Sequence, residues 1–261
     1  MVDKSKVIAI LLAYNSKNTI KEFYENLPKH LFDEILLFDD SSQDGTFEIS
    51  KFLGIKSYRN RVNLGYGGNL KKALAVAVSK NADIIVDIHP DNEYKPDAIP
   101  HALKLVEKCI ELVLGNRFYK ANYISNKSGM FKWKIIPIVL LNYISRILLR
   151  IKVNDLHQGF RVYSKSLLEK INFEKNSSDY LFSFELISQA VFTKSKIAEV
   201  PVKTQYKGDK RGAKLKSSII YTVGTFKTLL LFLLAKSGFE VTIFKNPNEK
   251  LIKRAKNILK A

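Results

Sequence analysis

The chain has 261 residues, of which 46% are hydrophobic and 11% aromatic, and its formal net charge is +18. This apolar content excludes a disordered protein, because its burial offsets the entropy lost on folding, and the length fits one large α/β domain with a short appendage. The single cysteine, Cys109, excludes an internal disulfide and a cysteine-based zinc cluster. The charge leaves three classes of partner open: nucleic acid, an anionic membrane surface or a phosphate-bearing substrate.

The positive charge is concentrated in the second half of the chain. Between Glu111 and Asp155 there are eight basic residues and no acidic one, residues 200–239 carry a net +7, and residues 245–261 carry +5. The first 111 residues are almost neutral. We therefore expect an anionic partner to meet the second half of the protein.

Short β-rich runs alternate with helical patterns in the first half. The apolar run at residues 7–13 predicts a buried strand rather than a secretion signal, because it is short and lacks a small-residue cleavage pattern. Strands are predicted at Val7–Ala13, Glu34–Asp39, Ile55–Arg59, Ile84–Ile88 and Leu112–Gly115, and helices at Thr19–Leu27, Thr46–Leu53 and Gly68–Ser79. This alternation is typical of an α/β fold with a doubly wound, mainly parallel sheet and helices on both faces.

Two apolar stretches lie in the second half, at residues 135–151 and 217–235. In the first, a polar residue recurs at every fourth position, and in the second, Lys227 lies near the centre, where a charge costs roughly 2.5 to 3.5 kcal/mol in a membrane span. The polar residues of the first stretch are Asn142, Arg146 and Arg150. Such interruptions favour helices that lie in the headgroup plane of a membrane. Two buried core helices, or a marginal span at 217–235, are the alternatives.

Three carboxylates follow the second predicted strand, within the segment Asp39-Asp40-Ser41-Ser42-Gln43-Asp44. In an open α/β sheet, ligands bind at the carboxyl ends of the strands, so Asp39 or Asp40 can accept hydrogen bonds from a base or a ribose. Asp44 precedes a predicted helix, and we assign it to the turn and the helix N-terminus.

Two further segments have residue types that hold phosphates or cations. Residues 63–69, Asn-Leu-Gly-Tyr-Gly-Gly-Asn, precede a helix as phosphate-cradling loops do, although their spacing fits neither the Walker nor the dinucleotide fingerprint. After the fourth predicted strand, His89 and Asp91 are two residues apart, so both can face one side of an extended segment. An imidazole and a carboxylate so placed can hold Mg²⁺ or Mn²⁺ against a diphosphate. A polar strand end without a metal is the alternative.

Together with Ala13-Tyr14-Asn15 at the end of the first strand, these motifs occur in an order known from one family. The chain resembles the family 2 inverting glycosyltransferases of the GT-A fold, particularly the branch related to dolichyl- and polyprenyl-phosphate sugar synthases. The resemblance extends from about Val7 to Phe239. It implies a GT-A, Rossmann-like sheet, a nucleotide-sugar donor and a divalent cation.

The resemblance also implies roles for individual residues of the donor site. Asp91 stands at the second aspartate of the family's Asp-x-Asp metal motif, and His89 stands where the first aspartate is usual, so the metal ligands would be Asp91 and His89. Leu12 and Ser16 replace the usual proline and glutamate around Ala-Tyr-Asn. The residues implied in nucleotide-sugar binding are Ala13, Tyr14, Asn15, Asp39, Asp40, Gly67, Asp91 and Glu185.

In the second half, the resemblance implies an acceptor site. The segment from Asp155 to Arg161 is similar to the family's acidic-x-x-x-Gly-Phe/Tyr-Arg run, which makes Asp155 the candidate base; a phosphate acceptor is already anionic, so Asp155 can orient rather than deprotonate. We expect His157 to be structural. For Arg211, a solvated basic loop is the alternative. The residues implied in binding the acceptor phosphate are Arg117, Lys132, Arg161, Arg211 and Lys214.

The predicted function is therefore an inverting hexosyl transfer from a nucleotide-diphosphate sugar to a membrane acceptor in cell envelope biosynthesis. The preferred acceptor is a polyprenyl (dolichyl or undecaprenyl) phosphate, and the protein is expected on the cytoplasmic face of the membrane, peripheral or monotopic. The catalytic domain is expected over residues 1–215, with a donor half at 1–115 and an acceptor half at 116–215. Residues 216–261 are expected to form a membrane-associated apolar helix and basic tail.

Three other functions fit parts of the pattern. Transfer to a hydroxyl of a glycan or glycolipid would use the same donor site. A nucleotidyltransferase should carry a glycine loop directly after the first strand, where this chain has Tyr14-Asn15-Ser16-Lys17. A basic nucleic-acid-binding protein should spread its charge over a face with aromatic platforms, whereas here the charge lies beside apolar helices, so we expect no nucleic-acid partner.

Overall fold

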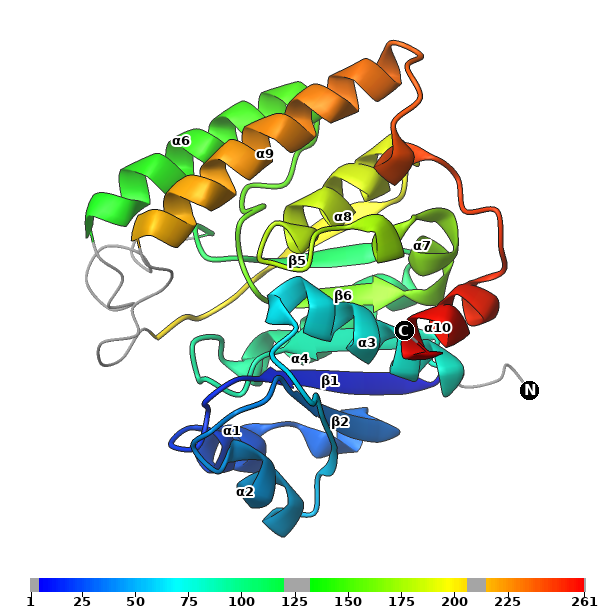
Figure 1. Cartoon of the computed structure of the whole chain (residues 1–261). Coiled ribbons are helices and arrows are strands. Elements are labelled where there is room, and N and C mark those ends of the chain that lie inside the picture. Colours follow the sequence, from blue (N-terminus) through cyan, green and yellow to red (C-terminus); the bar gives the residue numbers. More distant parts are fainter. Residues whose placement is uncertain (1–4, 120–131, 206–214, 261) are drawn as a thin grey trace.

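The computed structural model describes residues 5–119, 132–205 and 215–260. Its centre is a seven-stranded sheet with the strand order β3-β2-β1-β4-β6-β5-β7 (Figure 1). Strands β1 to β4 are mutually parallel, as are β5 and β7, whereas β6 runs antiparallel between β4 and β5. The strands are β1 (Val7–Ala13), β2 (Glu34–Asp39), β3 (Lys56–Arg59), β4 (Ile84–Ile88), β5 (Leu112–Asn116), β6 (Arg161–Ser164) and β7 (Ile197–Pro201). The predicted mainly parallel sheet is confirmed.

Helices cover both faces of this sheet, which explains why its central strands are continuously apolar. All seven residues of β1 are buried, and because side chains alternate along a strand, Ile8 and Ile10 join one core cluster while Leu11 and Ala13 join the other. The α-helices are α1 (Ile20–Asn26), α2 (Thr46–Phe52), α3 (Gly65–Ser79), α4 (Ile99–Glu107), α6 (Lys132–Leu149), α7 (Lys165–Lys170), α8 (Phe182–Phe192), α9 (Leu215–Lys236) and α10 (Leu251–Lys260). Short 3₁₀ turns lie at Lys29–Leu31, Pro96–Ala98, Phe173–Lys175 and Thr242–Phe244.

The strand order reverses at β1, which has β2 on one side and β4 on the other. Such a reversal opens a crevice at the carboxyl ends of the strands, where ligands bind in doubly wound sheets. The segments that follow β1, β2 and β4 therefore meet at one edge of the sheet, on the left in Figure 1. These are the three segments in which the sequence analysis found candidate donor-site residues.

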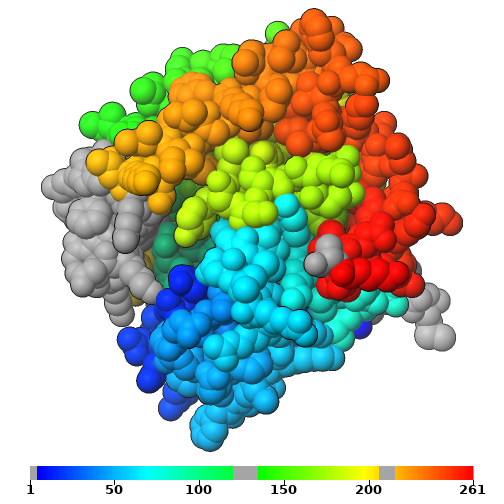
Figure 2. Space-filling model, in the orientation of Figure 1, coloured from blue at the N-terminus to red at the C-terminus, as the bar shows by residue number. Residues whose placement is uncertain are grey.

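Helices α6 and α9 lie side by side along one side of the molecule (Figure 1). The inward side of α9 is buried against the domain through Thr225, Thr228, Leu229 and Phe232, and α9 contacts α8. By length and composition α9 could cross a membrane, with a mean hydropathy of 1.7. In Figure 2 the orange atoms of α9 and the green atoms of α6 form one rim of the molecule.

The outward sides of α6 and α9 carry many exposed apolar side chains, which we call the apolar face, with the exposed Lys227 among them. Its members on α6 are Ile136, Val139, Leu140, Tyr143 and Ile147, and on α9 they are Leu215, Ile219, Ile220, Val223, Phe226, Leu230 and Leu233. Twelve large apolar side chains on two neighbouring helices form a patch of the kind that marks an interaction surface.

The C-terminal segment belongs to the core of the domain rather than forming a separate appendage. Helix α10 packs on α3, and Leu251 and Ala255 are buried in the same cluster as Ile8 of β1. The guanidinium of Arg254 donates to the carbonyl oxygens of Leu168 (2.6 Å) and Ile171 (2.8 Å) at the end of α7. Within the described residues, α10 of the basic tail thus packs on the α/β domain, and the division of the chain at residue 215 stays a prediction.

Candidate active site

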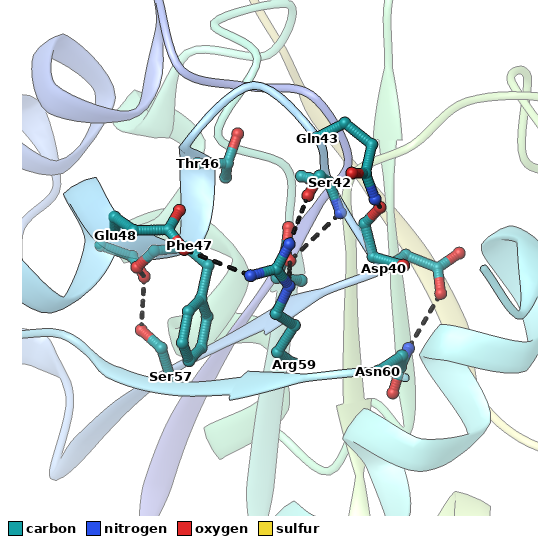
Figure 3. Close-up of polar contacts among 12 residues, drawn as sticks. Asp40, Ser42, Gln43, Thr46, Phe47, Glu48, Ser57, Arg59 and Asn60 are labelled. Atoms are coloured by element: carbon teal, nitrogen blue, oxygen red, sulfur yellow. Dashed lines mark hydrogen bonds and ion pairs between the residues drawn. The ribbon is translucent and has the colours of Figure 1, made fainter. Parts of the chain in front are cut away.

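Polar side chains form a network beside the end of β2, among them Asp40, Ser42, Arg59 and Asn60 (Figure 3). The Asp39 carboxylate is fully buried; its Oδ2 accepts the backbone N–H of Ser42 (3.2 Å) and lies 3.4 Å from Nε of Arg59. Burial raises the pKa of Asp39 above its usual value. Its Oδ1 has no hydrogen-bond partner among the described residues. A buried carboxylate oxygen without a donor is costly, so this atom suits a ligand N–H or O–H.

Asp40 supports the loop instead of facing a ligand with both oxygens. Its Oδ1 accepts the amide of Asn60 (2.9 Å) and the backbone N–H of Leu64 (2.8 Å). The amide of Asn63 also donates to the Asp40 carbonyl oxygen (3.2 Å). Asp40 thus joins the end of β2 to the start of α3, and contact with a ribose would have to use its other oxygen.

The residues after β1 are fixed by the loop after β2. Asn15 has a positive φ of 50°, its N–H donates to Oγ of Ser42 (2.8 Å), and its Oδ1 accepts the N–H of Gln43 (3.1 Å). Ala13 is buried in β1, whereas the side chain of Tyr14 is 53% exposed. Of these three donor-site candidates, Tyr14 presents the open side chain.

Asp44 has the turn role that the sequence predicts. Its Oδ1 accepts the N–H (3.0 Å) and the hydroxyl (2.6 Å) of Thr46 at the start of α2, and its Oδ2 accepts the N–H of Lys17 (3.0 Å). These hydrogen bonds close the turn before α2 and hold it against the loop after β1.

His89 and Asp91 lie just beyond β4. The imidazole of His89 is 19% exposed, with its Nε2 buried 3.7 Å from Oδ1 of Asp87, a carboxylate fully buried within β4. Oδ2 of Asp87 accepts the hydroxyl of Tyr163 (3.0 Å). Asp91 is exposed, and its Oδ1 accepts the N–H of Glu93 (2.9 Å). No site role was predicted for Asp87 from the sequence. Its position two residues before His89, on the same side of an extended strand, is a signal that it lies near that ring.

These residues fit a weakly ligated divalent cation. Within the described residues, no group of three or more His, Cys, Asp or Glu side chains is positioned for a metal ion. Mg²⁺ commonly takes one or two protein ligands and completes its coordination with substrate phosphates and water, so Asp91 with His89 is a sufficient protein share. Metal-ligating histidines are commonly oriented by a carboxylate behind the ring, and Asp87 lies in that direction, with its Oδ1 3.7 Å from Nε2 of His89.

The glycine-rich segment packs against protein, which corrects its predicted role as a phosphate cradle. A Cβ atom at Gly67 would lie 2.7 Å from Cβ of Phe182 and 2.8 Å from the carbonyl oxygen of Asp179. The backbone N–H of Gly68 donates to the carbonyl oxygen of Ser178 (3.1 Å). The space in front of Gly67 is therefore filled by the 177–179 backbone, and we attribute the glycine to this close approach rather than to nucleotide contact.

Arg117 and Asp155 form a buried ion pair in the acceptor half. Nε and Nη2 of Arg117 donate to the two carboxylate oxygens of Asp155 (2.7 and 2.9 Å), and the Arg117 N–H donates to Oδ2 (3.1 Å). Nη2 also donates to the carbonyl oxygen of His157 (2.7 Å). Asp155 is fully buried. Both predicted residues are thus together, but Asp155 holds Arg117 with both oxygens instead of facing an open site.

Two other predicted residues are occupied within the protein. Arg161 is buried, and its Nη1 donates to the hydroxyl of Tyr66 (3.3 Å) while Nη2 donates to the Gln158 carbonyl oxygen, so its assignment to the acceptor phosphate stays a prediction. Glu185 is also buried, and its carboxylate accepts the N–H (2.6 Å) and the hydroxyl (2.8 Å) of Ser177. Burial raises the pKa of Glu185. Glu185 therefore supports the loop before α8, and its contact with the donor stays a prediction.

His157 is structural, as expected. Its ring stacks on Phe184 with 5.1 Å between centroids, and its Nδ1 is hydrogen-bonded to the hydroxyl of Tyr221 (2.7 Å). Burial lowers the pKa of His157 to about 3. The ring is therefore neutral at ordinary pH.

The structure does not describe the side chains of three predicted phosphate-binding residues. Arg211 and Lys214 fall outside the described residues, and Lys132 begins α6 with a side chain that is not described. Their roles stay predictions.

Two tyrosines that were not predicted as site residues stack on each other, and one of them lies next to His89. Tyr66 lies edge-on to His89, with 5.5 Å between ring centroids, and Tyr180 stacks on Tyr66 at 5.5 Å. Tyr66 stands within the glycine-rich segment, so its aromatic side chain among glycines was the available signal. Tyr180 lies more than a hundred residues away, and no sequence pattern connects it to that segment.

Comparison with solved structures shows the fold. The structure of glucosyl-3-phosphoglycerate synthase from Mycobacterium tuberculosis in complex with phosphoglyceric acid superposes with a TM-score of 0.66, at 18% identity, over 91% of this chain and 82% of that one. The same enzyme with Mn²⁺ and uridine-diphosphate-glucose gives a TM-score of 0.65, at 18% identity, over 91% and 81%. The GT-A-like fold that the sequence resemblance implied is confirmed.

Two characterised relatives and a family model match the sequence. UDP-N-acetylglucosamine–dolichyl-phosphate N-acetylglucosaminyltransferase of Methanococcus voltae is 30% identical over 79% of this chain and 88% of its own length. Polyprenol monophosphomannose synthase of Mycolicibacterium smegmatis is 24% identical over 76% of each chain. The model of glycosyl transferase family 2 matches residues 8–172. With its strand-end carboxylates at the reversal point of a GT-A-like sheet, the chain belongs to glycosyl transferase family 2 and is a glycosyltransferase.

Proposed function

We propose that this glycosyltransferase moves a sugar, with inversion, from a nucleotide-diphosphate donor onto a polyprenyl phosphate at a membrane surface. Two relatives support this acceptor, since their names give dolichyl phosphate and polyprenol monophosphate chemistry. The nucleotide-sugar donor follows from the family and from the strand-end site around Asp39 and Asp91.

The observation that carries the proposal is the direct link between the apolar face and the acceptor half of the site. Asn142 on α6 accepts the N–H of Leu156 (2.8 Å), and Tyr221 on α9 is hydrogen-bonded to His157 (2.7 Å). Both helices of the apolar face are therefore bonded to the loop that carries Asp155. A lipid whose apolar chain contacts these helices would have its phosphate next to that loop.

The ion pair of Arg117 and Asp155 favours a phosphate acceptor over a hydroxyl acceptor. A hydroxyl must lose its proton during attack, which needs a base within reach of the substrate. Asp155 is fully buried and bound to Arg117 through both oxygens, so it orients an arginine instead. A phosphate oxygen is already anionic and needs positioning by cations, for which a fixed guanidinium is suited.

In the donor half, Asp91 and His89 would hold Mg²⁺ or Mn²⁺ against the diphosphate. A cation held there would supply positive charge to offset the charge on the leaving nucleoside diphosphate. Asp39 would bind the nucleoside through its unpartnered Oδ1, and Tyr14 would lie beside it with an open ring.

The apolar face would lie on the membrane with α9 parallel to its surface, because the inward side of α9 is packed on α8. The basic residues of the second half would contact anionic headgroups, which are enriched on the cytoplasmic leaflet. This arrangement makes the protein peripheral or monotopic at the cytoplasmic face.

The test is a transfer assay with the full chain, Mn²⁺ and a panel of radiolabelled sugar nucleotides. Polyprenyl phosphate and a glycolipid with free hydroxyl groups are offered separately in detergent. Labelled polyprenyl-phosphate sugar supports the proposal. Transfer to the glycolipid alone would establish the hydroxyl acceptor instead.

A further inference from the structure

We infer that Tyr180 is a stacking platform for the sugar ring of the donor, and so a specificity-determining residue of the proposed transfer. Its ring is 58% exposed, yet it is stacked on Tyr66 with an interplanar angle of 22°. One face of the phenol is thus covered by the partly buried Tyr66, and more than half of the Tyr180 side chain is exposed. A rigid, half-covered aromatic ring offers contact area at low cost in conformational entropy.

The loop that carries Tyr180 is fixed from two directions. From α8, Glu185 accepts the N–H (2.6 Å) and hydroxyl (2.8 Å) of Ser177. From α3, the N–H of Gly68 donates to the Ser178 carbonyl oxygen (3.1 Å), and Gly67 allows the close approach of the two backbones. Glu185 and the glycine-rich segment, which the donor site does not use directly, therefore both act on the position of Tyr180.

Tyr180 is connected to the candidate metal ligand His89 through one aromatic ring. Tyr66, on which Tyr180 stacks, contacts His89 edge-on, with 5.5 Å between ring centroids in both pairs. The sugar of a nucleotide-diphosphate donor is bonded to the phosphate next to the cation. A ring one aromatic contact away from His89 is consequently placed on the side of that sugar.

The order of the strands favours the sugar over the base as the group that stacks. Asp39, which suits the nucleoside, ends β2, and β1 separates β2 from β4 and His89. On the other side of β4 from β1 lies β6, and Arg161 at the start of β6 donates to the hydroxyl of Tyr66 (3.3 Å). Nucleoside, diphosphate and sugar would then follow the strand order β2, β4, β6. The exposed phenol would cover the apolar C–H face of a pyranose ring.

The test compares a nucleoside diphosphate with its sugar-bearing form, measured by calorimetry on the full chain in detergent with Mn²⁺. UDP, GDP and their hexose and N-acetylhexosamine derivatives serve as probes. Removing the ring in Tyr180→Ala should weaken binding of the sugar nucleotide about tenfold and leave the affinity for the nucleoside diphosphate unchanged. Tyr180→Phe should bind both ligands with wild-type affinity. Phe52→Ala, which removes an exposed aromatic ring from α2, is the control.

The outcomes separate this inference from the proposed function on which it rests. An equal loss of affinity for the sugar nucleotide and the nucleoside diphosphate would show that Tyr180 stacks on the base or only supports the site. That result would overturn its proposed role in stacking on the sugar. Unchanged binding of both ligands would overturn it as well, with the proposed function intact. Failure of the wild type to bind any sugar nucleotide would overturn both.

Discussion

The hydroxyl of Tyr221 on α9 lies 2.7 Å from Nδ1 of His157, so a helix of the apolar face is hydrogen-bonded to the loop of the buried ion pair. The main-chain carbonyl of the same histidine accepts Nη2 of Arg117 (2.7 Å). A displacement of α9 would therefore be transmitted through a single residue to the guanidinium proposed to meet the acceptor phosphate.

Replacing Tyr221 by Phe should reduce transfer to polyprenyl phosphate about tenfold, because one hydrogen bond to a buried ring nitrogen is lost. Donor affinity, measured by calorimetry, should stay at the wild-type value. Thr222→Val is the control, since its hydroxyl bonds only within α9, to the Ser218 carbonyl (2.9 Å). Equal turnover of Tyr221→Phe and wild type would show that the bond does not position the loop.

Desolvation of the partly buried His157 ring predicts a pH dependence of stability. Burial lowers its pKa to about 3, whereas in the unfolded chain histidine titrates near 6.5. Below pH 6.5 the unfolded state therefore binds more protons than the folded state. As the pH is lowered, the unfolding free energy decreases by up to about 1.4 kcal/mol per pH unit until the folded-state pKa is reached. In urea titrations between pH 7 and 4.5, His157→Gln should show a smaller slope than wild type. His30→Gln, at an exposed histidine, should keep the wild-type slope.

Breaking the ion pair from one side should destabilise the protein. Asp155→Asn leaves the guanidinium of Arg117 buried without its counter-charge, a loss of about 3 to 5 kcal/mol in unfolding free energy. The double variant Arg117→Met, Asp155→Leu should recover much of this stability and remain inactive in transfer. Full activity of the double variant would exclude Arg117 from the acceptor site.

Asp91→Asn should abolish the Mn²⁺-dependent part of donor binding while leaving the fold intact, because the carboxylate is exposed and accepts only a local N–H. Thermal shift with UDP-sugar, with and without Mn²⁺, measures this difference. Asp97→Asn removes another exposed carboxylate, paired with Lys203 (3.0 Å), and should respond to the metal as wild type does. A normal metal response in Asp91→Asn would remove Asp91 from the metal site.

Gly67→Ala should destabilise the protein by about 1 to 3 kcal/mol, as overpacking of a close backbone contact does. The new Cβ would meet the Asp179 carbonyl at 2.8 Å and displace the loop before α8. Gly54→Ala is the contrast: it introduces only backbone strain at a φ of +74°, with no atom within 4 Å. Urea unfolding of the two variants separates overpacking from strain.

The sequence predicted best where the chain is repetitive and apolar. The bounds of β1, β2 and β4 were predicted without error, since continuous buried runs followed by polar turns have few other interpretations. Strand β6 was missed because it begins with the buried Arg161, and a charged residue argues against a central strand until its partners are known. Residue types at the site were found, but their pairing was not: Arg117 and Asp155 are 38 positions apart.

The glycine-rich segment shows why a motif can be located correctly and still be assigned to the wrong partner. Glycine is needed wherever another group approaches the backbone closely, whether that group is a phosphate or a peptide. Here the approaching group is the 177–179 backbone, about 110 positions further along the chain, which sequence periodicity does not reveal.

The hydrogen bonds between Arg254 and the end of α7 bear on how the protein is made. They connect residues 83 and 86 positions apart, and α10 covers α3, a helix made early in translation. Until α10 has been made and has folded back, one side of α3 lies uncovered. The core is therefore completed late in synthesis, and contact of the apolar α9 with lipid would shield the nascent protein from aggregation.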